Sequence, residues 1–140
     1  IDMGTGAGFP GLVIAIARPD AQIHLIESDA KKCEFLKTVS RETSSLKGGV
    51  IIHNSRIETV PPFFADIITA RALASLTELL GYALTYANIN PDLKMIYLKG
   101  ARWESEIDDA RHIYMFDVKT HESLTSNQSR VLIISNLKSK

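Results

Sequence analysis

The sequence has little cysteine, no long hydrophobic run and no excess of either charge. Its single cysteine, Cys33, excludes an internal disulfide and a cysteine-based metal site, so we expect a reducing, cytoplasmic setting and no metal. No apolar stretch reaches the length of a membrane span, and we expect no membrane partner. Sixteen basic and 16 acidic residues leave a net charge of zero. Any contact with nucleic acid must therefore come from local basic clusters.

The length and composition are those of one soluble globular domain. The chain has 140 residues, of which 45% are hydrophobic and 23% charged. This is enough for one domain with a real core, which we assign to residues 1–140. The opening residues Ile1-Asp2-Met3 resemble the end of a first strand. We therefore expect a further N-terminal portion before them.

Residues 2–11, Asp-Met-Gly-Thr-Gly-Ala-Gly-Phe-Pro-Gly, are the most informative segment. Glycine permits positive φ and close approach of the backbone to a ligand. The apolar helix predicted after the loop offers unpaired N–H groups and the positive end of its dipole. Pro10 fits the first turn of such a helix. The segment predicts a site for a nucleotide-like cofactor, with a ligand-free glycine-rich turn as the alternative.

Two cofactor patterns overlap in this loop. Residues 6–11 match G-x-G-x-x-G, the dinucleotide fingerprint, which predicts NAD. Residues 2–8 match an acid followed by alternating glycines, which is typical of class I S-adenosylmethionine methyltransferases. The cofactor-binding candidates in the loop are Asp2, Gly4, Gly6 and Gly8.

Glu27 is the second anchor of the predicted cofactor site. It closes an apolar strand, and an acid roughly 20 residues beyond the glycines reaches the ribose hydroxyls in such folds. Both NAD enzymes and methyltransferases use this acid, so Glu27 does not choose between them. Its alternative role is to cap the helix that follows at Ser28 or Asp29.

Strand and helix signals alternate along the chain, which predicts an α/β fold with a mainly parallel sheet and helices on both faces. Strands are expected at residues 1–3, 22–26, 50–53, 65–70 and 93–98, and helices at 10–18, 29–46, 75–86 and 103–110. The expected buried helix positions are Phe35, Leu36 and Val39, then Leu76, Leu79, Leu80, Ala83 and Leu84.

The end of the chain changes character. Residues 113–118 and 131–137 have strand patterns with no helix between them, so they should pair antiparallel. A parallel sheet that ends in an antiparallel hairpin is typical of class I methyltransferases. This feature favours a methyltransferase over a dinucleotide dehydrogenase.

Several segments resemble the bacterial ribosomal small-subunit methyltransferase G family, also called the glucose-inhibited division protein B family. The loop at residues 2–11 matches the family's distinctive loop, and its Phe-Pro-Gly end is rare among other methyltransferases. Residues 25–28 with Lys31-Lys32, 55–58, 70–76 and 98–100 are similar to further family segments. Ala70 and Leu73 depart from the family signature, and Glu27 stands where the family commonly has Asp.

The resemblance implies S-adenosylmethionine-dependent methylation of guanine N7 in 16S ribosomal RNA. The implied partner is 16S RNA or the small ribosomal subunit, and an N-terminal helical segment that helps to recognise RNA would precede this chain. Carried over by position, Gly4 and Phe9 would contact the cofactor, and Ile57 and Glu58 would bracket the adenine. Arg71 would lie at the mouth shared by cofactor and substrate. We expect the protein to act as a monomer.

The chemistry implied in this way needs no general base, because guanine N7 carries a free lone pair. The enzyme then supplies mainly positioning. The sequence agrees, since its four histidines (24, 53, 112 and 121) are scattered and Cys33 lies on a helix away from the mouth. Arg71 and Lys99, which end two strands, are the predicted substrate-positioning residues. The RNA-binding candidates are Lys31, Lys32 and Arg56.

Two other functions remain open from the residues. An NAD-dependent oxidoreductase would explain the literal G-x-G-x-x-G. A non-enzymatic RNA-binding module that has kept the fold is the other function, and the intact cofactor loop argues against it. Each basic candidate has a plainer interpretation as a solvated surface charge. Trp103 and Tyr97 can stack a flipped base, although Tyr97 fits a core position better.

Overall fold

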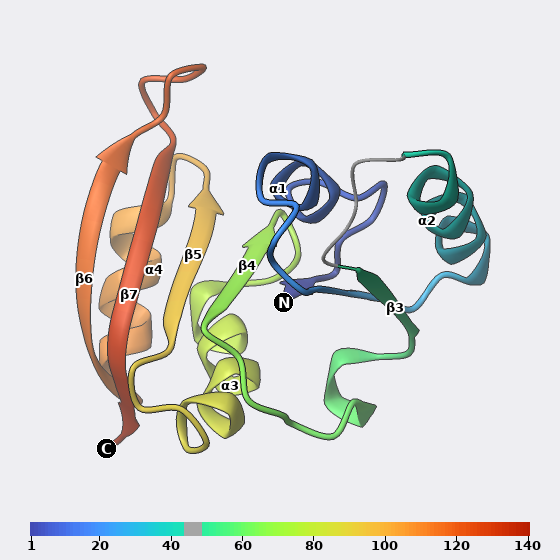
Figure 1. Ribbon diagram of the computed structural model, residues 1–140. Helices are drawn as coiled ribbons and strands as arrows, with labels where there is room; N and C mark the ends of the chain where they lie inside the picture. Colours follow the sequence, from blue (N-terminus) through green and yellow to red (C-terminus); the bar gives the residue numbers. More distant parts are fainter. Residues whose placement is uncertain (44–48) are drawn as a thin grey trace. The chain divides into compact units, whose positions relative to one another are not determined.

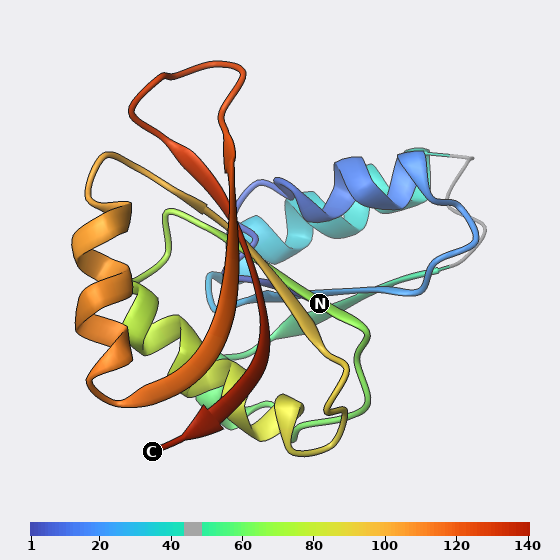
Figure 2. The same ribbon diagram turned by 90° about the vertical axis from the view of Figure 1, so that its left-hand side faces the viewer.

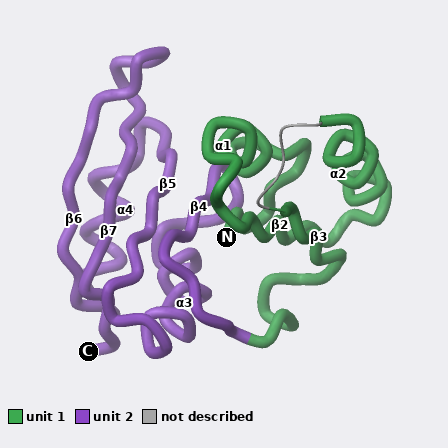
Figure 3. The backbone as a smooth tube through the Cα atoms, viewed as in Figure 1, with its two compact units in different colours: residues 1–61 green, residues 62–140 purple. Residues whose placement is uncertain are grey.

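The computed structural model describes residues 1–43 and 49–140. These residues form two compact units, unit 1 (residues 1–61) and unit 2 (residues 62–140), which are coloured separately in Figure 3. No helix among the described residues is long and apolar enough to cross a membrane. The predicted extent of one domain stays a prediction, and each unit is described by itself.

Unit 1 is a parallel α/β unit whose strands lie in the order β3-β2-β1 (Figure 1). Its elements are β1 (Asp2–Met3), α1 (Gly11–Ala17), β2 (Ile23–Glu27), α2 (Ala30–Glu42), β3 (Val50–Asn54) and the 3-10 turn η1 (Ile57–Thr59). Asp2 is paired in register with Leu25, and Glu27 with Asn54. The carboxyl ends of β2 and β3 therefore lie at one edge of the sheet. The segments that lead from β2 to α2 and from β3 to η1 begin at this edge.

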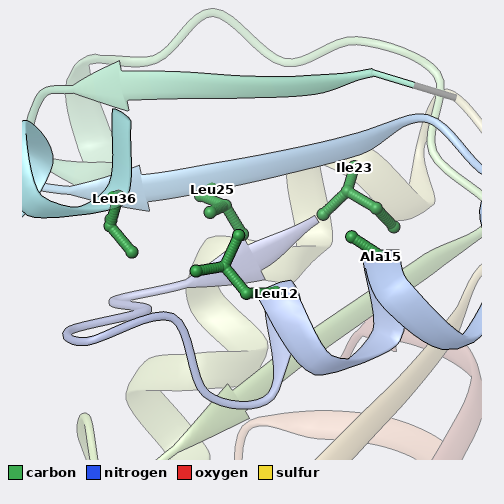
Figure 4. Close-up of a cluster of buried hydrophobic side chains, with 5 residues drawn as sticks. All are labelled: Leu12, Ala15, Ile23, Leu25 and Leu36. Atoms are coloured by element: carbon green, nitrogen blue, oxygen red, sulfur yellow. The ribbon is translucent and has the colours of Figure 1, made fainter. Parts of the chain in front are cut away.

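The core of unit 1 is made where α1 and α2 cover one face of β2. Figure 4 shows Leu12 and Ala15 of α1, Ile23 and Leu25 of β2 and Leu36 of α2 pointing toward one another. The alternation of a strand brings Ile23 and Leu25 to one face, and helical spacing does the same for Leu12 and Ala15. Each large side chain buried here contributes about 1.5–3 kcal/mol.

Two local predictions in unit 1 need correction. Phe35 is wrong as a core residue, since it is 52% exposed. Helix α2 buries Cys33 and Leu36, three residues apart, and Phe35 lies off that face. Pro10 precedes the first turn as the N-cap of α1. The predicted end of the second helix near residue 46 lies outside the described residues.

Unit 2 is a mixed unit whose strands lie in the order β4-β5-β7-β6. Its elements are β4 (Ile67–Arg71), α3 (Leu76–Ala87), β5 (Lys94–Lys99), α4 (Trp103–Arg111), β6 (Tyr114–Glu122) and β7 (Arg130–Ser139). β4 and β5 are parallel, whereas β7 is antiparallel to both β5 and β6. The predicted antiparallel hairpin at the end of the chain is confirmed, and its strands are longer than predicted.

Helices α3 and α4 lie side by side in unit 2, beside the long curved hairpin (Figure 2). Helix α3 begins with a capping box: Ser75 Oγ accepts the N–H of Glu78, and the Glu78 carboxylate accepts the N–H of Ser75. The predicted buried positions are confirmed at Leu76, Leu79, Leu80 and Ala83. Leu84 is only half-buried, and the buried Tyr86 was missed.

Candidate functional site

The carboxylate of Asp2 shapes the glycine-rich loop from inside. Asp2 Oδ2 accepts the hydroxyl of Thr5 at 2.5 Å and the N–H of Gly11 at 2.9 Å. Asp2 is only 2% exposed. These bonds join β1, the loop and the first residue of α1, because a charged acceptor makes strong hydrogen bonds. The structure thus gives Asp2 a supporting place, and its direct contact with a cofactor stays a prediction.

The alternating glycines have backbone angles that side chains disfavour. Gly4, Gly6 and Gly8 have φ of 61°, 59° and 96°, in the left-handed region. A Cβ on Gly8 would stand 2.4 Å from Leu12 Cδ1, whereas one on Gly6 would meet nothing within 4 Å. The loop is therefore packed on the side of Gly8 and open beside Gly6, where a ligand can approach.

Glu27 bridges the loop and the start of α2. Its Oε2 accepts the N–H of Gly6 at 2.9 Å, and its Oε1 accepts the N–H of Asp29 at 2.9 Å. The carboxylate is at the end of β2, in a residue only 8% exposed. The true N-cap of α2 is Asp29, whose side chain accepts the N–H groups of Lys31 and Lys32. The N–H of Lys32 contributes most to lowering the pKa of Asp29.

Two residues that the sequence analysis did not place at the site hold the backbone of Glu27. Asn54 Nδ2 donates to the carbonyl oxygens of Glu27 at 3.3 Å and Ser28 at 3.2 Å. Cys33 Sγ donates to the same Glu27 oxygen at 3.3 Å. Cys33 is buried, and burial raises the pKa of its thiol. The cysteine thus lies beside Glu27, as a neutral packing group rather than a thiolate.

The remaining candidates of unit 1 lie on its surface. Phe9 is 53% exposed, and Ile57 is half-buried beside the exposed Glu58 in η1. The backbone of segment 55–59 is joined to Glu27 by a hydrogen bond, because the N–H of Ser55 donates to the Glu27 carbonyl at 3.1 Å. The exposed basic candidates are Lys31, Lys32 and Arg56. The loop, Glu27 and the start of α2 are thus brought together by hydrogen bonds, while the roles of the outer residues stay predictions.

Unit 2 carries a hollow of about 800 Å³ at the carboxyl ends of β4 and β5, here called the unit 2 hollow. Its walls are the loop after β4, the loop after β5, the first turns of α4 and the turn between β6 and β7. Arg71 and Lys99 both line it. Arg102 and Arg130, which the sequence analysis missed, line it as well. Four cations from three segments of the chain therefore meet around one space.

Lys99 is held by contacts within unit 2. Its Nζ lies 2.6 Å from Glu106 Oε2 and donates to the carbonyl of Ala74 at 2.9 Å. The same Glu106 oxygen accepts the N–H of Leu76 at 2.7 Å. The Lys99 side chain is only 9% exposed. Its charge is thus balanced inside the protein, and its predicted contact with substrate stays untested.

Two of the four histidines are neighbours, contrary to the prediction that all are scattered. His24 Nδ1 and His53 Nε2 are 2.9 Å apart on the adjacent strands β2 and β3, and the rings are stacked. Register is the physical reason, since parallel pairing of β2 with β3 brings the two histidines together. Within residues 1–43 and 49–140, no group of three or more His, Cys, Asp or Glu is placed to hold a metal ion.

The histidine pair predicts a loss of stability at mildly acid pH. Burial lowers the pKa of both rings, and the charge of His53 lowers that of His24 further. Below pH of about 6.5 the unfolded chain therefore binds more protons than the folded one, and stability falls. The unfolding temperature should drop between about pH 7.5 and about pH 5.5. His53→Gln should reduce this drop, whereas His121→Gln, a change at an exposed histidine, should leave it unchanged. An equal drop in the two variants would contradict the assignment of the pH effect to the histidine pair.

Solved structures with similar backbones define the class of fold. The crystal structure of magnesium protoporphyrin IX methyltransferase from Synechocystis PCC 6803 with bound SAM matches with a TM-score of 0.67 and 14% identity, over 95% of this chain and 67% of that one. The mitomycin 7-O-methyltransferase structure matches with a TM-score of 0.73 and 12% identity, over 96% and 48%. The fold is that of a class I methyltransferase, as the strand pattern predicted.

Sequence comparisons give the family. The family model described as rRNA small subunit methyltransferase G matches residues 1–133. The ribosomal RNA small subunit methyltransferase G of Paracoccus denitrificans is 36% identical, over 99% of this chain and 69% of that protein. Its counterpart in Paramagnetospirillum magneticum is 41% identical, over 94% and 62%. The chain belongs to the rRNA small subunit methyltransferase G family, and it spans 62% of the latter relative's length.

Proposed function

We propose that this chain binds S-adenosylmethionine in unit 1 and serves the methylation of guanine N7 in 16S ribosomal RNA. The observation that carries the proposal is the bond from the N–H of Gly6 to Glu27, which ties the glycine loop to the acid at the end of β2. Membership of the rRNA small subunit methyltransferase G family supports the reaction. The guanine N7 atom and the 16S RNA follow from the family resemblance.

The residues of unit 1 fit this cofactor. The open side of the loop beside Gly6 leaves room for it, and Glu27 Oε1 and Oε2 each keep a lone pair for a ribose hydroxyl. Phe9 offers a half-exposed aromatic surface next to the loop. Structures of similar fold have been solved with SAM and with SAH. Ile57 and Glu58 are proposed for the adenine, because their segment starts at the Glu27 carbonyl.

The proposed chemistry asks little of acid or base groups. When bound, S-adenosylmethionine would supply an electrophilic methyl group, which would pass from its sulfur to the lone pair of guanine N7 and leave S-adenosylhomocysteine. No proton must be removed from N7, so this chain needs only to hold the two reactants in line and to exclude water. Four basic residues are proposed to hold the RNA, namely Arg71, Lys31, Lys32 and Arg56. The raised pKa of Cys33 fits a mechanism that needs no thiolate.

The test is calorimetric titration of the protein with S-adenosylmethionine and, separately, with NAD. Binding of S-adenosylmethionine alone is expected, followed by methyl transfer to 16S RNA at a guanine that aniline cleaves after reduction. Binding of NAD alone would make residues 6–11 a true dinucleotide fingerprint and the protein an NAD-dependent oxidoreductase. Binding of neither would overturn the proposed cofactor site.

Gly4→Val is expected to abolish cofactor binding while the fold persists. Gly4 has φ of 61°, which is a strained angle for a β-branched residue, and its backbone lines the proposed site. Calorimetry measures the affinity, and the far-ultraviolet circular dichroism spectrum checks the fold. Unchanged affinity in a folded variant would contradict the placement of the cofactor at this loop.

A further inference from the structure

We propose that the unit 2 hollow binds the phosphodiester backbone of the RNA through Arg71 and Arg102, while Lys99 and Arg130 hold its walls. The inference rests on the proposed function, because that function makes RNA the substrate. The four cations around the hollow fall into two pairs, according to whether the charged group already has partners within the protein. The inference also assigns Arg102, which neither the sequence motifs nor the family comparison singled out.

Arg130 is committed to the turn between β6 and β7. Its Nη1 donates to the carbonyl of Asn127 at 2.8 Å and to that of Ser129 at 2.9 Å. Its guanidinium also lies over the ring of Trp103, with Cζ 5.5 Å from the ring centroid. Nη2 faces Glu122 at 3.8 Å. These contacts join the hairpin turn to the start of α4 and leave Arg130 a structural role in the wall.

Lys99 is committed to the loop that follows Arg71. It holds the carbonyl of Ala74, and through Glu106 it holds the N–H of Leu76 at the start of α3. The loop needs such support because Ala72 has φ of 50°, an uncommon angle for a residue with a side chain. Lys99 is therefore a positioning residue, which acts on RNA by fixing the loop that presents Arg71.

Arg71 and Arg102 are the cations left for a ligand. Both are exposed, and in the part of the chain that the structure describes neither guanidinium has a hydrogen bond or an ion pair. Arg71 is the last residue of β4 and Arg102 is the N-cap of α4. With Lys99 balanced by Glu106, these two charges outnumber Asp109, the other acid lining the hollow. A guanidinium fork matches two phosphate oxygens at once.

The deciding experiment is the salt dependence of binding to protein-free 16S RNA. Each phosphate contact adds about 0.7–0.9 to the slope of log affinity against log salt. Arg102→Gln and Arg71→Gln should each lower the slope by that amount and weaken binding about fivefold to tenfold at about 0.1 M salt. Arg111→Gln is the matched control, since Arg111 is an exposed arginine at the other end of α4 that does not line the hollow.

A rescue experiment separates positioning from direct contact at Lys99. Lys99→Met leaves the Glu106 carboxylate without its cation in a mostly buried place, which disturbs the loop. The double variant Lys99→Met with Glu106→Gln removes that charge and should recover the salt slope of the unsubstituted protein. A lysine that touched phosphate would leave the slope of the double variant lower by one phosphate contact, or about 0.7–0.9.

The outcomes that overturn the inference are distinct from those that overturn the proposed function. Any one of four results overturns the inference. These are an unchanged slope in Arg102→Gln, an equal fall in Arg111→Gln, no recovery of the slope in the double variant, and no measurable RNA binding by the unsubstituted protein. The cofactor site lies in unit 1, so S-adenosylmethionine affinity should stay unchanged in Arg102→Gln. Failure of the unsubstituted protein to bind S-adenosylmethionine overturns the proposed function.

Discussion

Glu27→Gln is expected to weaken S-adenosylmethionine binding by about tenfold to a hundredfold, or about 1.4–2.7 kcal/mol. The carboxylate accepts one N–H from Gly6 and one from Asp29, with a different oxygen for each. Glutamine has one acceptor oxygen, so one of the two N–H groups must face an NH₂ donor. Either the glycine loop then loses its hydrogen bond to Glu27 of β2, or the start of α2 loses the hydrogen bond of Asp29 to the same residue. A ribose hydroxyl also loses a charged acceptor, which is worth more than a neutral one.

The matched control is Glu34→Gln, the same change on an exposed turn of α2. Glu34 pairs with Lys37 at 2.7 Å, with 71% of the Glu34 side chain exposed. Such an exposed pair contributes little, and we expect no change in cofactor affinity and little change in stability. Calorimetry gives the affinities. A folded Glu27→Gln protein with the affinity of the control would reduce Glu27 to a capping acid, the alternative that the sequence left open.

The glycine loop and Glu27 could be predicted because each depends on a local pattern. Alternating glycines are typical of a loop with positive φ, and Gly4, Gly6 and Gly8 all have it. An acid at the end of a buried strand needs only the strand pattern to be placed. The inward turn of Asp2 could not be predicted, because it depends on the loop folding back so that Gly11 donates to the same carboxylate.

Contacts between distant segments were out of reach for a different reason. Asn54 meets Glu27, and His53 meets His24, only because β3 pairs with β2 in one particular register. A pattern along one strand does not contain the register of its neighbour. The helix face that buries Leu36 and exposes Phe35 is another case, since two adjacent apolar residues do not say which one faces the sheet.

The cations of the unit 2 hollow show the same limit at a functional site. Arg71 and Lys99 were predicted from their places at strand ends, and both line the hollow. The sequence treats them alike, yet their chemistry differs. Glu106, seven residues beyond Lys99, folds back through α4 to neutralise it, while Arg71 is left exposed. Whether a charge is available to a ligand is decided by such partners, and partners come from tertiary structure.

Gly11→Ala is expected to lower the free energy of unfolding by about 2–4 kcal/mol. A Cβ at Gly11 would stand 2.3 Å from Leu25 Cδ2, 2.8 Å from Asp2 Oδ2 and 2.9 Å from Asp2 Cβ. Leu25 is fully buried and Asp2 nearly so, so both must move within the core. Overpacking of this kind costs about 1–3 kcal/mol. Displacing Asp2 also weakens, without removing, its charged bond to the Gly11 N–H, and such a bond contributes about 1.5–3 kcal/mol when intact.

Gly100→Ala is the control, because a Cβ there meets no atom within 4 Å. Its stability should stay within about 0.5 kcal/mol of the parent, and denaturant unfolding of both variants measures the difference. Cofactor affinity should fall in Gly11→Ala as well, since the new Cβ displaces the side chain of Asp2, whose carboxylate shapes the glycine loop. Equal stability of the two variants would mean that Leu25 and Asp2 can both yield at no cost. The glycine after Pro10 would then be explained by the ligand rather than by the packing of β1 against α1.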